Sequence, residues 1–134
     1  HLYIENLKEL TEHRVDSLFD EIRRIESIRC KEYFPLTVKE KLLPMLNSDS
    51  RLYVYGAGLK AAEAIAALGM AQINISGVIV SDKKNNENYS YEYPLYELKE
   101  LEADDNMIVW PCLLAEREQV IHSLEEAGIK NIIY

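Results

Sequence analysis

The sequence predicts an α/β fold: a small Rossmann-like parallel sheet of about four strands, preceded by an N-terminal helical segment. Two observations predict the sheet. Short β-branched and aromatic runs alternate with helical patterns in the second half, and the first of these runs, 52–55, ends at the glycine-rich turn Gly56-Ala57-Gly58. A third observation predicts the helical segment, because apolar residues recur every three to five positions through residues 2–30. Strands that alternate with helices imply parallel pairing with right-handed crossovers.

The first 50 residues have the pattern of a helical appendage. The amphipathic pattern spans Leu2–Cys30, and Thr37-x-x-Glu40 has the form of a capping box that opens a short second helix. Pro44 is expected to end or kink that helix, because proline lacks the backbone donor and clashes with the preceding turn. The polar run 47–50 is a turn. We therefore divide the chain into a helical linker at 1–48 and a Rossmann-like domain at 51–134.

The second half alternates strands with helices. Each predicted helix stops at a glycine, Gly69 for the first and Gly128 for the second, a residue type that suits the left-handed position after a helix. After the polar run 81–93, we expect a short extended piece at 94–96 and a helical turn at 97–101. The predicted strands are 52–55, 73–80, 107–110 and 131–134, and the predicted helices are 59–68 and 116–127.

Composition and charge restrict the class of protein. Of the 134 residues, 48% are hydrophobic and 28% are charged, which is enough for a hydrophobic core. The net charge is −8, and residues 51–134 hold 7 basic and 13 acidic side chains, against 8 and 10 in residues 1–50. We expect no nucleic-acid partner, because such a surface repels a phosphate backbone. No apolar run approaches the roughly 20 residues that span a bilayer. Cys30 and Cys112 lack the spacing of a zinc site or a disulfide scaffold, so we expect reduced thiols in a cytoplasmic protein.

The glycine-rich turn matches the pattern G-x-G-x-x-[GA] of phosphate-binding turns. Gly56 lets the chain turn tightly off the strand, Gly58 has no Cβ and so allows a pyrophosphate to approach the backbone, and Ala61 keeps the helix close to the strand. The first amides of the helix lie at its positive end and have no partner within the helix, so they can bind an anion. The predicted phosphate-binding residues are Gly56, Ala57, Gly58, Leu59, Lys60 and Ala61.

An acidic residue follows this turn at the distance expected for a dinucleotide fingerprint. Asp82 lies 21 residues after Ala61, at the end of the second predicted strand, where a carboxylate that binds a ribose hydroxyl belongs. Ser81 precedes it and completes the predicted site. Lys83 and Lys84 follow and could instead contact a phosphate. The alternative interpretation is that the glycines only form a tight turn in a domain that has lost its ligand.

Four segments together resemble a known family. They are Tyr53-Val-Tyr-Gly-Ala-Gly58, Gly77-Val-Ile-Val-Ser-Asp82, Tyr93-Pro-Leu-Tyr-Glu-Leu98 and Glu125-Glu-Ala-Gly-Ile-Lys-Asn-Ile-Ile133. With them, residues 51–134 resemble a bacterial Rossmann-like module attached to capsule and cell-surface polysaccharide enzymes, including glycosyltransferases and FkbM-type methyltransferases. They are also similar to the nucleotide-sugar-binding N-terminal domain of sugar N-acetyltransferases, although the chain has none of the hexapeptide repeats of those enzymes. The resemblance implies a nucleotide- or nucleotide-sugar-binding domain of a polysaccharide-biosynthesis protein, with the phosphate turn at residues 56–58 and Asp82 as the acid.

The sequence shows no complete catalytic constellation and no metal-ligand spacing. A short-chain dehydrogenase would need Tyr-x-x-x-Lys, and Tyr96-Glu-Leu-Lys99 is one residue too short, so a small NAD(P)-dependent oxidoreductase is less favoured. Cys112 follows the third predicted strand without a histidine near it in sequence, which favours a structural thiol. Three tyrosines alternate along 89–93 and either stack on a base or sugar ring or pack at a strand edge; alternation favours packing.

Two functions of different classes remain. The first is a nucleotide- or nucleotide-sugar-binding module, noncatalytic as an isolated chain, whose ligand is a nucleotide-sugar or NAD(P). The alternative is a ligand-free structural domain that assembles through its N-terminal helix into a homo-oligomer. The other expected partner is a covalently linked catalytic domain, which the resemblance implies. Because the chain begins at His1 rather than at methionine, we expect a fragment of a longer protein or a processed form.

Overall fold

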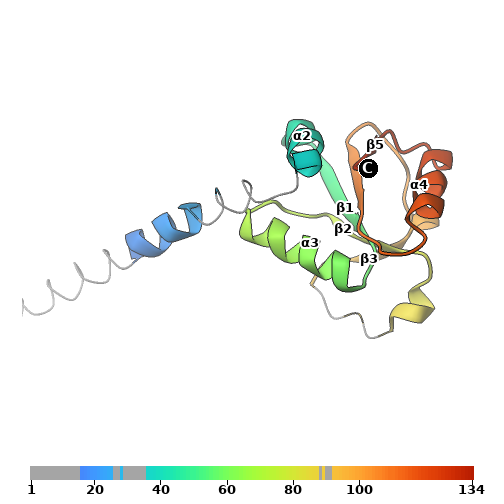
Figure 1. The fold of residues 1–134 in the computed structure, drawn as a ribbon, viewed down its shortest axis with the longest axis horizontal. Coiled ribbons are helices and arrows are strands. Elements are labelled where there is room, and N and C mark those ends of the chain that lie inside the picture. Colours follow the sequence, from blue (N-terminus) through green and yellow to red (C-terminus); the bar gives the residue numbers. More distant parts are fainter. Residues whose placement is uncertain (1–15, 26–27, 29–35, 88, 90–91) are drawn as a thin grey trace, which may run out of the picture.

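The computed structural model describes residues 16–25, 28, 36–87, 89 and 92–134, and the sequence from residue 36 onward forms an α/β unit (Figure 1). Its central strand, β1, leads through helix α3 to the next strand in the chain, and helix α4 connects the last two strands. The elements, in chain order, are α2 (Leu36–Met45), β1 (Arg51–Tyr55), α3 (Leu59–Met70), β2 (Gly77–Val80), the 3-10 helix η1 (Lys83–Asn86), β3 (Leu95–Glu97), the 3-10 helix η2 (Leu98–Glu100), β4 (Met107–Pro111), α4 (Arg117–Glu126) and β5 (Asn131–Ile132).

The five strands form one parallel sheet in the order β3-β2-β1-β4-β5. In the register of the sheet, Tyr55 at the end of β1 is opposite Ile79 of β2 on one side and Pro111 of β4 on the other. The chain thus runs outward from β1 to β3 and returns to the other side of β1 with β4. The α/β class and the parallel sheet are confirmed, but the sheet has five strands where about four were predicted.

The additional strand is β3, which was expected only as an extended piece. Gly77 explains why this short segment pairs with β2: a Cβ at Gly77 would lie 2.6 Å from the Tyr96 ring, so the absent side chain leaves room for the ring. Tyr96 also meets Tyr53 edge to face, with ring centroids 6.0 Å apart. A strand of three residues carries too little periodicity to be recognised, and this contact between distant residues is not visible in the sequence.

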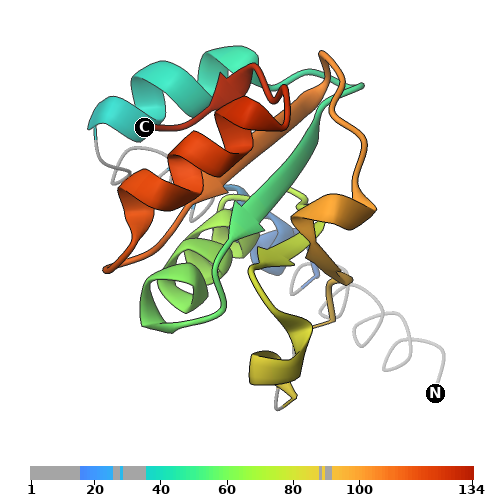
Figure 2. The same ribbon diagram turned by 90° about the vertical axis from the view of Figure 1, so that its right-hand side faces the viewer.

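The two faces of the sheet carry separate hydrophobic clusters. On one face, Leu52 and Val54 of β1 pack with Ala61 and Leu68 of α3 and with Leu42 of α2. On the other face, residues of α4 and the aromatic side chains of β1 form the second cluster, and α4 lies in front of the sheet in Figure 2. Helices on both faces agree with strands that are buried almost throughout.

Helices α3 and α4 end in different ways. The prediction that Gly69 ends α3 is wrong, because α3 continues through it to Met70 and the left-handed residue is Gln72, with φ +58°. The amide of Ile73 then donates to the Leu68 carbonyl over 2.9 Å, which closes the helix end. At the end of α4, Gly128 takes φ +85° as predicted. The predicted strand 73–80 is correspondingly shorter, and only Gly77–Val80 pairs in the sheet.

Helix α2 belongs to the α/β unit, although the sequence pattern predicts it as part of the helical linker at 1–48. It begins at Leu36, so Thr37 lies inside the helix and not at the capping position. Pro44 lies in the last turn, and the helix ends one residue later. Leu42 is fully buried in the core cluster that includes Ile133. The polar run 47–50 is therefore a turn within a packed unit.

Residues 16–25 form a helix that stands clear of the sheet in Figure 1, and all of its residues are exposed. Its large apolar side chains include Leu18, which is 58% exposed, and Phe19, which is 55% exposed. The remainder of the predicted helix Leu2–Cys30, apart from Ile28, lies outside the described residues. Within the described ranges, no helix is both long and apolar enough to cross a membrane.

Candidate functional site

The glycine-rich turn leaves β1 through Gly56, which adopts φ +122°. This region of backbone space strongly favours glycine. A Cβ at this position would also lie 2.8 Å from the Cys112 carbonyl oxygen and 3.0 Å from a methyl group of Leu113. The Gly56 amide donates to the Ile79 carbonyl over 2.8 Å. Gly56 therefore makes the tight turn and lets β1 approach the segment after β4.

Gly58 has a different environment, at the start of α3. Its backbone is extended (φ −89°, ψ −160°), and, its two chain neighbours aside, no atom of the described residues lies within 4 Å of the position that a Cβ would take. No side chain of the described residues caps α3. In the first turn of the helix, the Ala62 amide donates to the Gly58 carbonyl over 3.0 Å. Leu59 and Lys60 are exposed at this end. The positive end of α3 is thus open to an approaching anion.

Ala61 fixes the distance between α3 and β1. Its side chain is fully buried, and its Cβ lies 3.6 Å from the place where a Gly56 Cβ would be. A larger residue would push the helix away from the strand. As the sequence pattern predicts, Gly56 makes the tight turn, Gly58 leaves space beside the backbone, and Ala61 keeps the helix close to the strand.

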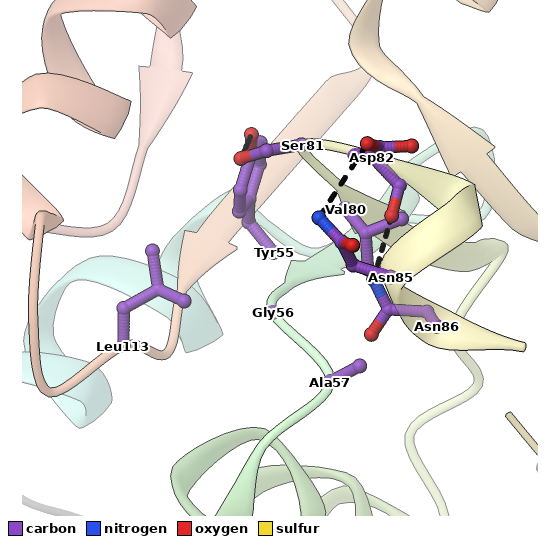
Figure 3. Close-up of a pocket in the computed structure, with 9 residues that line it drawn as sticks. All are labelled: Tyr55, Gly56, Ala57, Val80, Ser81, Asp82, Asn85, Asn86 and Leu113. Carbon is purple, nitrogen blue, oxygen red and sulfur yellow. Dashed lines mark hydrogen bonds between the residues drawn. The ribbon is translucent and has the colours of Figure 1, made fainter. Parts of the chain in front are cut away.

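A pocket of about 250 Å³ opens at the carboxyl ends of β1 and β2 (Figure 3). Leu113 borders it on one side, and the side chains of η1 border it on the other. Of the predicted site residues, it collects Gly56, Ala57, Ser81 and Asp82; the others, at the start of α3, lie outside its lining. The lining residues are Tyr55, Gly56, Ala57, Val80, Ser81, Asp82, Asn85, Asn86 and Leu113.

Asp82 shapes one wall of the pocket by capping η1. Its Oδ1 accepts the Lys84 amide over 2.8 Å, and its Oδ2 accepts the Asn85 side-chain amide over 3.4 Å. Its main-chain oxygen accepts the Asn86 side-chain amide over 2.8 Å (Figure 3). Asp82 therefore lies where the sequence predicted it, with both carboxylate oxygens engaged by its own chain; its contact with a ribose stays a prediction.

The lysine that follows Asp82 is not free for a ligand. The Lys83 ammonium lies 2.6 Å from a Glu100 carboxylate oxygen of η2. The hydrogen bond from Lys83 holds the pKa of Glu100 below its ordinary value. Lys83 thus ties η1 to η2 instead of pointing its charge into the pocket.

Five lining residues were not among the predicted site residues: Tyr55, Val80, Asn85, Asn86 and Leu113. The Tyr55 hydroxyl lies 2.8 Å from the Ser81 hydroxyl, and the pair closes one end of the pocket (Figure 3). The two asparagines follow Asp82 closely enough that a capped turn could have suggested them. Leu113 gives no local signal, because it reaches the pocket only through the pairing of β4 with β1.

The surroundings of Cys112 and of the tyrosines Tyr89 and Tyr93 indicate structural roles. Burial raises the pKa of the Cys112 thiol to about 12, although Lys60 and Arg117 act in the opposite direction, so this thiol stays protonated. Tyr89 and Tyr93 pack against the core cluster of α3, and the Tyr89 hydroxyl donates to the Tyr93 carbonyl over 2.7 Å. Among the residues with described positions, no group of three or more His, Cys, Asp or Glu side chains could hold a metal ion.

Comparison with protein-family models, with curated proteins and with solved structures finds no match for this chain. The resemblance to modules of polysaccharide biosynthesis therefore stays a prediction. What is known of the site is its geometry: an uncapped helix N-terminus beside a glycine with free space, next to a pocket at the ends of β1 and β2.

Proposed function

We propose that the α/β unit binds a nucleotide or nucleotide-sugar, with the phosphates on the turn formed by Gly56, Ala57 and Gly58. The observation that carries this proposal is the open space beside Gly58 at the uncapped start of α3. A phosphate can approach backbone amides only where no side chain intervenes, and the helix dipole favours its charge there. The exposed Lys60 adds a cation in the first turn of the helix.

The pocket beside this turn would receive the nucleoside part of the ligand. Its volume of about 250 Å³ is slightly below the roughly 300–1,000 Å³ of sites that enclose a whole drug-sized ligand. It therefore suits one part of a nucleotide, with the phosphates outside it at α3. Its position at the carboxyl ends of parallel strands is where open α/β sheets bind ligands.

The proposed context is a cytoplasmic step of surface-polysaccharide synthesis, in which this chain is a binding module of a larger protein. Support for that context comes from the resemblance of residues 51–134 alone. On this proposal a nucleotide-sugar is the favoured ligand and NAD(P) the second choice, and the catalytic groups belong to a linked glycosyltransferase or methyltransferase domain.

A thermal-shift panel on the 134-residue chain tests the proposal. Suitable probes are NAD⁺, NADP⁺, coenzyme A, S-adenosylmethionine, and UDP-, CDP- and GDP-sugars. A probe at 100 times its dissociation constant adds about 2.7 kcal/mol to the free energy of unfolding. We expect Gly58→Val to abolish that stabilisation, because its side chain fills the approach to the amides.

Gly69→Val is the matched control. Gly69 lies in the same helix, and beyond the helix's own backbone and its chain neighbours no atom of the described residues lies within 4 Å of its Cβ position, but it is far from the turn. It should bind the probe as the wild type does, after correction for any loss of stability. Normal binding by Gly58→Val would contradict the proposed phosphate site, and a panel without any stabilising probe would contradict nucleotide binding by this chain.

A second candidate function, self-association, is favoured by the helix of residues 16–25. Leu18, Ile22 and Ile25 lie at i, i+4 and i+7 on one face, and all are at least 40% exposed. The charges of this helix are segregated, with the acidic residues Asp16, Asp20 and Glu21 before the basic residues Arg23 and Arg24. An antiparallel pair of such helices would bury the apolar faces and place acidic halves against basic halves. The partner we propose is a second copy of this chain.

Analytical ultracentrifugation tests this second candidate independently of any ligand. The wild type is expected to be a dimer that Ile22→Glu converts to a monomer. Ser17→Gln, which changes an exposed polar position of the same helix and leaves its charges and its apolar face unchanged, should remain a dimer. A monomeric wild type at the micromolar concentrations used would contradict self-association through this helix.

A further inference from the structure

The hydrogen-bonding groups of the pocket differ from those that the sequence suggested. Asp82 already accepts one bond at each carboxylate oxygen from within η1. Of the described residues that line the pocket, Asp82 alone carries a charge. Lys83, the nearest cation in sequence, is paired with Glu100. The described lining is therefore neutral or negative, and an additional phosphate there would face Asp82 with no lysine or arginine among the lining residues.

The Tyr55 and Ser81 hydroxyls have hydrogen-bonding capacity to spare. Tyr55 is 5% exposed, with its ring held in the core cluster beneath α4, and its hydroxyl emerges at the sheet edge 2.8 Å from Ser81 Oγ. In a pair of hydroxyls, one O–H is donated inside the pair, which leaves the other O–H and several lone pairs unused. The pair thus offers a donor and acceptors together, without charge. Figure 3 shows it at one end of the pocket.

A sugar hydroxyl is the ligand group that matches this pair, because it is itself both a donor and an acceptor. We infer that the Tyr55–Ser81 hydroxyl pair recognises the unphosphorylated ribose of the bound nucleotide, while Asp82 builds η1 around it. This inference rests on the proposed nucleotide site. It assigns the ribose contact to the ends of β1 and β2 and predicts discrimination against a ribose that carries a phosphate.

Isothermal titration calorimetry on the full 134-residue chain tests the inference with four probe types. Inorganic pyrophosphate reports on the phosphate turn alone. ADP, UDP, GDP and CDP report on the turn plus the pocket, and the 2′,3′-dideoxy form of the tightest binder lacks the ribose hydroxyls. A ribose that carries a 2′-phosphate, as in NADP⁺ against NAD⁺, reports on charge in the pocket.

We expect Tyr55→Phe and Ser81→Ala each to weaken binding of the ribonucleoside diphosphate by about threefold to tenfold, as for the loss of a neutral hydrogen bond. Both variants should bind pyrophosphate and the dideoxy probe like the wild type. A purely structural role for either hydroxyl would weaken all probes equally. NADP⁺ should bind at least about tenfold more weakly than NAD⁺, as expected for a like charge that lacks a partner.

Tyr53→Phe is the matched control, because it removes a tyrosine hydroxyl from the same face of β1 outside the pocket. It should leave every affinity unchanged. The inference is overturned if Tyr55→Phe and Ser81→Ala leave diphosphate affinity unchanged, or weaken the dideoxy probe as much as the ribose form, while Gly58→Val still abolishes binding. The proposed function would survive that result. If the wild type binds neither pyrophosphate nor any of the four diphosphates, both fail together.

Discussion

The turns from β1 to α3 and from β4 to α4 lie side by side at the carboxyl edge of the sheet. They differ in the residue that precedes the helix and in the space around it. Both helices begin without a side-chain cap. Before α3, the residue at the capping position is Gly58, with extended backbone and free space beside it. Before α4, it is Glu116, which adopts a left-handed conformation with φ +61°. The preceding Leu114 is 80% exposed.

The two helix N-termini therefore differ in charge and in steric access. At α4, Glu116 at the capping position and Glu118 in the first turn supply negative charge near the positive end of the helix dipole. At α3, the first turn carries no acidic residue, the space beside Gly58 is free, and Lys60 adds a positive charge. This contrast supports the proposal that the β1–α3 turn is the binding turn, and the following experiments test it.

The largest expected effect concerns access to the two turns. In a Cys30→Ser background, Cys112 should react with a thiol reagent on the order of a thousandfold more slowly at pH 8 than a cysteine placed by Ala57→Cys in the open turn. The reason is that Cys112 is buried with its pKa raised to about 12. Labelling followed by mass spectrometry measures both rates. Equal rates would show that Cys112 is as accessible and as reactive as a thiol in the β1–α3 turn.

The next largest effect separates the two glycines. Gly56→Ala is expected to lower the free energy of unfolding by about 2–4 kcal/mol, because it combines a strained φ with a backbone contact that must shift. Gly58→Ala should change it by less than about 0.5 kcal/mol, since its Cβ meets nothing. Urea denaturation measures both. Similar losses in the two variants would show that the turn is equally packed around both glycines.

How much of this site follows from sequence depends on how local each cause is. The roles of Gly56, Gly58 and Ala61 were predictable, because strand, turn and helix lie within ten residues of one another. The pocket wall formed by Leu113 was not, since it depends on which strand pairs with β1. The sequence predicts Gly69 as the left-handed residue after α3. The helix instead continues to Met70, and Gln72 takes the left-handed conformation. Tertiary contacts, above all that between Gly77 and Tyr96, also decided the number of strands.

A smaller effect tests whether the open turn is kept open for a ligand. Gly58→Asp makes the start of α3 resemble that of α4, since it places a carboxylate at the capping position. We expect it to raise the free energy of unfolding by about 0.3–1 kcal/mol, because the carboxylate caps the helix and interacts with its dipole. It should also abolish pyrophosphate binding. A variant that gains stability and still binds pyrophosphate would place the anion elsewhere.

The smallest effect concerns acid stability, which should not distinguish the two turns. Hydrogen bonds from Arg51 and Lys83 hold the pKa values of Asp104 and Glu100 below their ordinary values. Their contribution to stability is therefore complete above about pH 5 and is lost as the pH falls through the lowered pKa values. Arg51→Met should flatten the part due to Asp104 in urea midpoints measured between pH 7 and pH 3. An unchanged pH profile would show that this ion pair contributes nothing measurable.

The packing of α2 has a consequence for how the protein can be divided. Leu42 fills a place in the same core cluster as Ile133, and the Lys41 ammonium lies 5.4 Å from the centre of the Tyr134 ring. The beginning and the end of the α/β unit therefore pack together on one face of the sheet and stabilise each other. A fragment cut at Arg51, where the sequence alone would place the border, would open the interior at its C-terminal strand, so any minimal expression product has to start before Leu36.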